Sequence, residues 1–132
     1  MEEITYEDFA KLDIRIGTII AAELVPNTDK LIKCTVDFGL EPPLETDGLG
    51  KRNIRTIVSG IAEWKKPEEL VGRQFPYVFN LAPRMLRGVE SQGMLVAANL
   101  SVGSEDAARE GEEGGIVLLE PERSVPPGTK LR

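Results

Sequence analysis

The sequence predicts an all-β fold: a small five-stranded barrel with short helices and a further strand in a C-terminal extension. Apolar residues recur at every second position in several short runs, the period of a strand that buries one face. Glycine, proline, asparagine and aspartate cluster between these runs and mark turns. With 132 residues and an apolar share of 41%, the chain is expected to form one domain, residues 1–132, with its own core.

The first elements are a helix and two strands. An N-terminal helix within residues 1–11 is predicted because a threonine and an aspartate have the spacing of a capping box. Alternating β-branched residues predict a long strand from Leu12 to Val25, which Gly17 is expected to bend. The next strand alternates more cleanly, and its predicted core-facing residues are Ile32, Cys34, Val36 and Phe38.

The second half adds three strands and a helix. A strand is expected over residues 54–59, then a short helix over 66–72, where a proline, two acids and a glycine occupy helix-boundary positions. Strands follow at 75–80 and 91–99. Five strands with a helix between the third and fourth are the arrangement of an OB-fold, whose open face commonly binds oligonucleotides or oligosaccharides. A strand in the C-terminal extension, residues 115–132, is expected to pair with the fifth.

The charge is unevenly distributed along the chain. A net charge of −6 argues against nucleic acid as a partner. However, four acids lie in the first eight residues, and the stretch 101–114, expected to be a flexible loop, holds five acids and one arginine. Residues 51–87 contain eight basic and three acidic residues, a net of +5. Local potential steers a partner more than net charge does, although a solvated surface without a partner stays an alternative.

The sequence offers little support for catalysis, a metal site or a membrane span. It has no histidine to act as a base, no phosphate-binding glycine loop and no nucleophile elbow. We therefore expect a non-catalytic protein without a cofactor or metal. The lone Cys34 is expected in the core. Because no apolar run is long enough to cross a bilayer and the first residues are acidic, a cytoplasmic protein is expected.

The stretch Asn80–Ala97 joins a strand end, a basic turn with Arg84 and Arg87, and an apolar strand. Ser91 stands where this last strand begins. No partner that would activate it as a nucleophile is apparent, so its hydroxyl is expected to order the turn into the strand.

Three blocks of sequence resemble the tRNA-binding domain that is appended to methionyl-tRNA synthetases and found in related factors. In chain order the blocks are Phe9–Gly17 with Val25–Leu31, Ile57–Ile61 with Lys66–Gly72, and Asn80–Met94. Their order and spacing cover most of residues 9 to 98. The resemblance implies a protein that binds tRNA by shape, at the outside of its folded corner, without aminoacylating it. It also implies a homodimer formed through the C-terminal extension, and is compatible with an aminoacyl-tRNA synthetase as a partner.

The resemblance also implies a tRNA-binding site when it is carried over residue by residue. Lysines would supply point charges to phosphates, and arginines would add planar forks that bridge phosphates or stack on bases. Asparagine and serine would offer adaptable hydrogen bonds, and a methionine beside them has burial in the core as its alternative. The implied site residues are Lys30, Lys33, Arg55, Asn80, Arg84, Arg87, Ser91 and Met94.

Two departures and one alternative accompany the resemblance. Many relatives have an additional lysine where this chain has Ala82 or Met85, so weaker tRNA binding is expected. The acidic stretch after Asn99 is longer than in the family pattern, and it would either repel RNA or screen the site in a dimer. The alternative function is that of CsaA-type secretion chaperones, which share the barrel and dimer and bind unfolded preproteins through an apolar groove. Their third block usually lacks the Gly93-Met94 pair, which favours the tRNA-binding branch.

Overall fold

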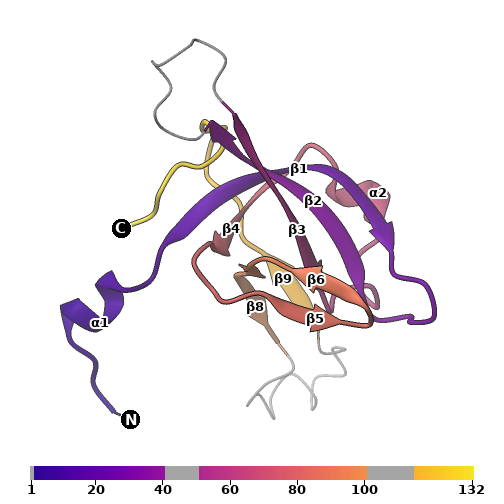
Figure 1. The fold of residues 1–132 in the computed structure, drawn as a ribbon, viewed down its shortest axis with the longest axis horizontal. Coiled ribbons are helices and arrows are strands. Elements are labelled where there is room, and N and C mark those ends of the chain that lie inside the picture. The colour runs from indigo at the N-terminus through magenta and orange to yellow at the C-terminus, as the bar shows by residue number, and fades with distance from the viewer. Residues whose placement is uncertain (1, 41–50, 101–114) are drawn as a thin grey trace.

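The structure, a computed structural model, describes residues 2–40, 51–100 and 115–132, so the expected acidic loop at 101–114 lies outside the described residues. A curled five-stranded sheet, in the order β3-β2-β1-β4-β7, forms the body (Figure 1). Its strands are β1 (Ile14–Leu24), β2 (Ile32–Leu40), β3 (Arg52–Ser59), β4 (Gln74–Val78) and β7 (Met94–Leu95). The smaller elements are α1 (Tyr6–Ala10), α2 (Pro67–Leu70), β5 (Arg84–Leu86), β6 (Val89–Ser91), β8 (Ala97–Asn99) and β9 (Ile116–Leu118). The predicted all-β, OB-like fold is confirmed.

The core lies on the concave side of the curled sheet. The four residues of β2 that alternation assigned to the core are each at most 3% exposed, which confirms the predicted face. They pack with Phe75, Tyr77 and Phe79 from the β4 segment. Burial raises the pKa of the Cys34 thiol to about 12, because a thiolate is poorly solvated there.

Strand β1 bends so that its two halves have different neighbours. Residues Ile14–Thr18 pair with β4, while the second half pairs with β2 across a register shift between Ile19 and Ala21. Gly17 was expected to bend this strand, but the register shift lies beyond it. Its lack of a side chain serves packing: a Cβ there would lie 2.4 Å from Cγ1 of Val36.

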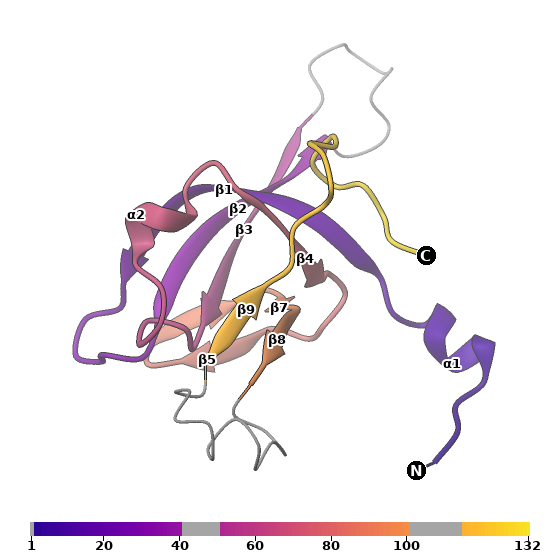
Figure 2. The same ribbon diagram turned by 180° about the vertical axis from the view of Figure 1, so that it is seen from behind.

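The predicted fifth strand over 91–99 is wrong in its continuity. The chain breaks into the end of β6, then β7, then β8, and the first of these breaks is at Gly93, whose φ of +150° turns the chain from one ladder to the next. A Cβ on Gly93 would lie 3.0 Å from the Val78 carbonyl oxygen. The predicted pairing of the extension with this segment is confirmed, since β8 and β9 pair from Ala97↔Leu118 to Asn99↔Ile116 (Figure 2).

The last residues of the chain are built into the barrel. Gly128 N donates to the Ile16 carbonyl at 2.7 Å, and Ile16 N donates to the Thr129 carbonyl at 2.8 Å. Leu131 N donates to the Ile14 carbonyl, also at 2.8 Å. The backbone of residues 128–131 therefore satisfies an edge of β1 within the same chain.

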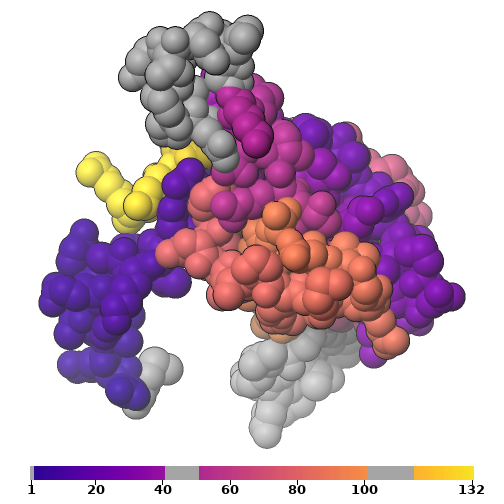
Figure 3. All heavy atoms as spheres, in the orientation of Figure 1, coloured from indigo at the N-terminus to yellow at the C-terminus, as the bar shows by residue number. Residues whose placement is uncertain are grey.

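Helix α1 projects away from the barrel in both ribbon views and forms a separate lobe in the space-filling view (Figure 3). Its predicted capping box is confirmed, with Asp8 N donating to Oγ1 of Thr5 at 3.2 Å. No residue of the helix is buried. Tyr6 is 75% exposed, and Ile4, Phe9 and Leu12 are also exposed.

Candidate nucleic-acid interface

The basic turn predicted after Asn80 folds as a β-hairpin. Strands β5 and β6 pair from Arg84↔Ser91 to Leu86↔Val89. Arg87 and Gly88, with φ of 51° and 81°, form the two-residue connection, and positive φ at both positions is typical of a type I′ turn. Sequence analysis missed the hairpin because arginine is unusual where asparagine or glycine is preferred. The sequence feature that could have predicted the turn is the Arg87-Gly88 pair between two apolar residues.

The two arginines of the hairpin point their charges to solvent. Arg84 and Arg87 are exposed, as is Met85 between them at 65%. Within the described parts of the chain, neither arginine side chain has a hydrogen bond or ion pair. Both are therefore ready to accept an external anion without first breaking an internal contact.

The hairpin is attached to β3 through Ser91 and Gln92. Val58 N donates to Oγ of Ser91 at 2.9 Å, and this hydroxyl donates to the Gly93 carbonyl at 3.2 Å. Gln92 N donates to the Thr56 carbonyl at 2.8 Å, and Thr56 N donates to Oε1 of Gln92 at 3.0 Å. Ser91 is only 4% exposed, so the interpretation of its hydroxyl as an ordering group is confirmed.

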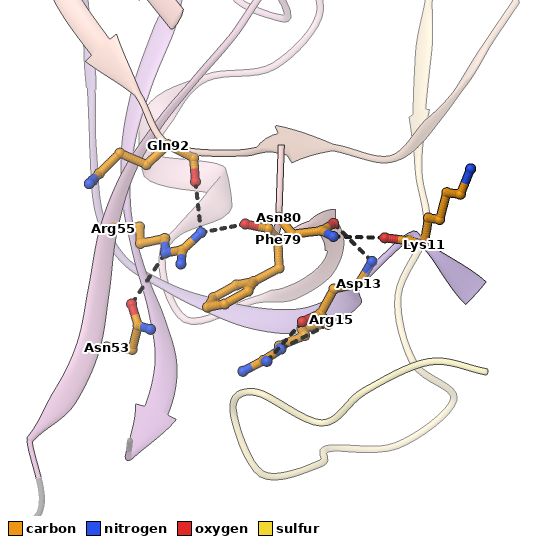
Figure 4. Close-up of polar contacts among 8 residues, drawn as sticks. All are labelled: Lys11, Asp13, Arg15, Asn53, Arg55, Phe79, Asn80 and Gln92. Atoms are coloured by element: carbon orange, nitrogen blue, oxygen red, sulfur yellow. Dashed lines mark hydrogen bonds and ion pairs between the residues drawn. The ribbon is translucent and has the colours of Figure 1, made fainter. Parts of the chain in front are cut away.

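Arg55, implied as a phosphate contact, faces inward (Figure 4). Its Nη1 donates to the carbonyl oxygens of Phe79 and, at 3.3 Å, of Gln92. Its Nε donates to Oδ1 of Asn53 at 3.3 Å. The Arg55 guanidinium carbon lies 3.5 Å from the centre of the Phe79 ring, and that of Arg15 lies 3.9 Å away. Two guanidinium groups so close cannot share one ring face, so Phe79 lies between them.

Asn80 fixes the junction between α1 and β1. Its Oδ1 accepts from Asp13 N at 2.9 Å, and its Nδ2 donates to the Lys11 carbonyl at 2.7 Å. Asp13 in turn accepts two hydrogen bonds from Arg15, at 3.0 and 2.8 Å. These hydrogen bonds hold the pKa of the Asp13 carboxyl below its usual range. Sequence analysis did not single out Asp13 or Arg15, although their spacing of two on a strand puts them on one face.

The two implied lysines differ in what they contact. Lys30, in the turn between β1 and β2, has an exposed side chain and accepts Ala62 N at its carbonyl at 3.0 Å. Lys33 on β2 forms an ion pair with Glu23 at 3.0 Å. A partly neutralised lysine attracts phosphate less strongly, so Lys30 is the better placed of the two.

A cleft of about 440 Å³ lies between the hairpin and the end of β3. Arg84, Ser91 and Met94 line it together with Leu31 from the β1–β2 turn. Its other apolar lining residues are Val58, Ile61, Leu81, Leu86, Leu95 and Ile116. Met94 is 45% exposed, so the alternative of burial in the core is wrong. The turn after β1 and the loop after β4 are the ligand-binding loops of OB-folds, and here both border the cleft.

The structure thus separates the eight implied residues. Arg84, Ser91 and Met94 meet at the cleft, with Arg87 at the tip of the hairpin above them. The side chains of Arg55 and Asn80 instead form hydrogen bonds within the chain, and neither residue lines the cleft. Within the described residues, no helix is long and apolar enough to span a membrane, and no group of three metal-ligating side chains is assembled.

Two curated or solved relatives and one solved chaperone illustrate what the chain is similar to. The chain is 44% identical over 131 residues to a methionine–tRNA ligase of Porphyromonas gingivalis, which covers 99% of this chain but 16% of that protein. A methionyl-tRNA synthetase related protein from Pyrococcus horikoshii superposes with a TM-score of 0.78 at 37% identity, covering both chains completely. The chaperone CsaA from Bacillus anthracis superposes with a TM-score of 0.71 at 30% identity, covering 99% of this chain and 100% of the chaperone.

The family comparison covers nearly the whole domain. Residues 14–130, from the first residue of β1 to the C-terminal segment that forms an isolated bridge with it, match the family of tRNA binding domains. With this match and these relatives, the resemblance that the three sequence blocks carried is confirmed: the chain belongs to the tRNA binding domain family.

Proposed function

We propose that this chain is a non-catalytic tRNA-binding protein that recognises the shape of tRNA through the β5–β6 hairpin and the neighbouring β1–β2 turn. Arg84 and Arg87 would contact phosphates on one side of the cleft, and Lys30 would do so from the other. Ser91, Arg55 and Asn80 would shape the surface. The proposal puts the protein in the cytoplasm, where tRNA is used in translation.

The observation that supports the proposal most is a pair of exposed arginines, on a loop where OB-folds bind nucleic acid, whose side chains have no partner among the residues that the structure describes. A guanidinium without a partner in the protein can form two hydrogen bonds to a phosphate, and little free energy is spent on breaking earlier contacts. Because the chain belongs to a family of tRNA binding domains, we propose that the nucleic acid it binds is tRNA.

The test is a filter-binding titration against total tRNA and against an unrelated RNA, at two salt concentrations. The double variant Arg84→Ala, Arg87→Ala should bind all tRNAs more weakly, with the log–log salt slope smaller by about two. Lys51→Ala with Arg123→Ala is the matched control, because it removes the same charge from two exposed residues that line neither the cleft nor the hollow beside α1. Wild-type binding that is absent or independent of salt would reject the proposal.

We further propose a homodimer in which a second copy covers α1. Helix α1 has no buried residue: Tyr6 and Phe9 on it and Ile4 and Leu12 beside its ends are exposed, so this apolar surface has no cover among the described residues. A hollow of about 300 Å³ lined by these aromatic residues and by Leu131 lies beside it. The C-terminal extension would thus contribute to the dimer through side chains, since backbone groups of residues 128–131 bond to β1 of their own chain.

Sedimentation of Tyr6→Ser with Phe9→Ser tests the dimer. The variant should sediment as a monomer while its thermal unfolding stays close to that of the wild type, because neither side chain is buried in the barrel. Removal of residues 121–132 is a poorer test, since it strips β1 of its hydrogen bonds. A dimeric mass for the double variant would reject the role of α1.

A synthetase is the proposed destination of the bound tRNA. The chain spans 16% of the length of the matched ligase, so in that relative the similar region is one part of an enzyme. We propose that this domain brings tRNA to a methionyl-tRNA synthetase, within one chain or between chains. Co-sedimentation with that synthetase, with and without tRNA, would test the association.

The alternative function is a chaperone that binds unfolded preproteins. The apolar lining of the cleft and the similarity to CsaA chaperones favour it. A chaperone of this kind would suppress aggregation of an unfolded protein, and the Arg84→Ala, Arg87→Ala variant would do so equally well. Aggregation that proceeds unchanged in the presence of the wild type would reject this alternative.

A further inference from the structure

We propose that Arg55 acts as a positioning residue that closes the base of the basic hairpin, and that it contributes to RNA binding through this closure and not through contact with phosphate. The proposal rests on the proposed tRNA-binding function. We call the paired hydrogen bonds from Arg55 to the Phe79 and Gln92 carbonyls the Arg55 clasp.

The clasp lies where regular pairing stops. Strands β4 and β7 pair at Tyr77↔Leu95 and Val78↔Met94, and no further pair follows. Beyond this point the two segments separate into the excursion that contains the hairpin. Phe79 and Gln92 flank residues 80–91, so one guanidinium bonds the carbonyls on both sides of the stem (Figure 4). These are bonds that a ladder would otherwise have supplied.

Other contacts fix the guanidinium itself. Its carbon Cζ lies 3.5 Å from the centre of the Phe79 ring, and Oδ1 of Asn53 accepts a hydrogen bond from its Nε. Arg15, held by Asp13, covers the opposite ring face at 3.9 Å. Phe79 is 8% exposed and belongs to the core. The clasp is therefore anchored to the rigid part of the barrel, whereas the hairpin that it closes is largely exposed.

A point charge would not reproduce this arrangement. The Arg55 guanidinium donates to two carbonyl oxygens from Nη1 and to Asn53 from Nε, and it also packs over a ring, whereas the ammonium of lysine has one nitrogen and does not stack in this way. A phosphate contact would instead tolerate lysine, because charge dominates such contacts. The variant Arg55→Lys therefore distinguishes the two roles: it should weaken tRNA binding if Arg55 positions the hairpin, and should leave binding nearly unchanged if Arg55 contacts phosphate.

The experiment compares Arg55→Lys and Arg55→Gln with Arg84→Lys and Arg84→Gln. Amide hydrogen exchange of residues 84–91 is measured in the free protein, and tRNA affinity is measured against salt concentration. Both Arg55 variants should speed hairpin exchange and weaken tRNA binding by similar factors, on the order of tenfold, without changing the salt slope. Arg84→Lys should bind nearly as the wild type, Arg84→Gln should lower the slope by about one, and neither should alter exchange.

Asn53→Ala is a milder variant, because it removes only the acceptor of the Arg55 Nε. It should change hairpin exchange in the same direction by a smaller factor, and it keeps the test valid if Arg55→Gln does not fold. Wild-type behaviour of Arg55→Lys, with a slope lower by about one in Arg55→Gln, would identify a phosphate contact and overturn the proposal. Unchanged exchange in every variant rejects the clasp, whereas absence of tRNA binding in the wild type rejects the proposed function and the RNA-binding role together.

Discussion

The chain holds two pairs of arginines that sequence alone does not distinguish. Arg15 and Arg55 lie on opposite faces of Phe79, bonded to a carboxylate or to backbone carbonyls. Arg84 and Arg87 lie on the hairpin, exposed and without a side-chain partner among the described residues. The first pair stabilises the fold, and the second is available to a ligand. Internal partners, and not charge, distinguish the arginines that are bonded within the fold from those that are proposed to bind tRNA.

The largest expected effect follows from removing the ring between the first pair. Phe79→Ala should lower the free energy of unfolding by about 3–5 kcal/mol, since it leaves a cavity and two guanidinium groups without their stack. Met85→Ala in the exposed hairpin is the control and should change it by less than about 0.5 kcal/mol. Urea unfolding measures both. If the two variants lose equal free energy of unfolding, the two regions contribute equally to stability, and the contrast drawn between them is wrong.

Asn80 stands between the two regions. Asn80→Ala removes the hydrogen bonds to Lys11 and Asp13 and should lower the free energy of unfolding by about 1–2 kcal/mol. If its role is structural, tRNA affinity should change much less than in Arg84→Ala. Urea unfolding and filter binding on the same variant decide this. A large loss of affinity with full stability would move Asn80 to the ligand-binding group.

Arg87 should respond in opposite directions in two assays. Its φ of 51° is unfavourable for a residue with a Cβ, so Arg87→Gly should raise the free energy of unfolding by up to about 1 kcal/mol. The same change removes a proposed phosphate contact and should weaken tRNA binding. Thermal unfolding and salt-dependent binding measure the two effects. Lower stability would argue that the arginine side chain supports the hairpin after all.

The smallest expected effect is an acid dependence at Asp13. Because Arg15 holds the pKa of this carboxyl below its usual ~4, the unfolded chain binds more protons between the two values. The stabilisation is fully present above pH ~4 and is lost as pH falls through the folded value. Urea midpoints of the wild type and Asp13→Asn should therefore differ at neutral pH and converge in acid. If the two urea midpoints differ by the same amount at every pH, the Asp13–Arg15 ion pair is not the cause of the difference in stability.

Local patterns predicted the regular parts of this molecule well. The alternation in β2 identified its buried face, and the capping box identified the start of α1. Where contacts between distant segments compete with pattern, prediction was wrong. Gly93 interrupts an apolar run because the Val78 carbonyl approaches it, and Arg87 occupies a turn position that its residue type does not suggest.

Four properties follow from the amino-acid sequence alone: the period of the strands, the turns between them, the order of the blocks that marks the family, and a basic middle third. Those properties depend on neighbouring residues and on composition, so they can be read along the chain. Which basic side chains form hydrogen bonds or ion pairs within the protein became known from the folded structure. That outcome depends on acceptors far away in sequence, such as the carbonyls 24 and 37 positions from Arg55, which fold formation brings to one guanidinium.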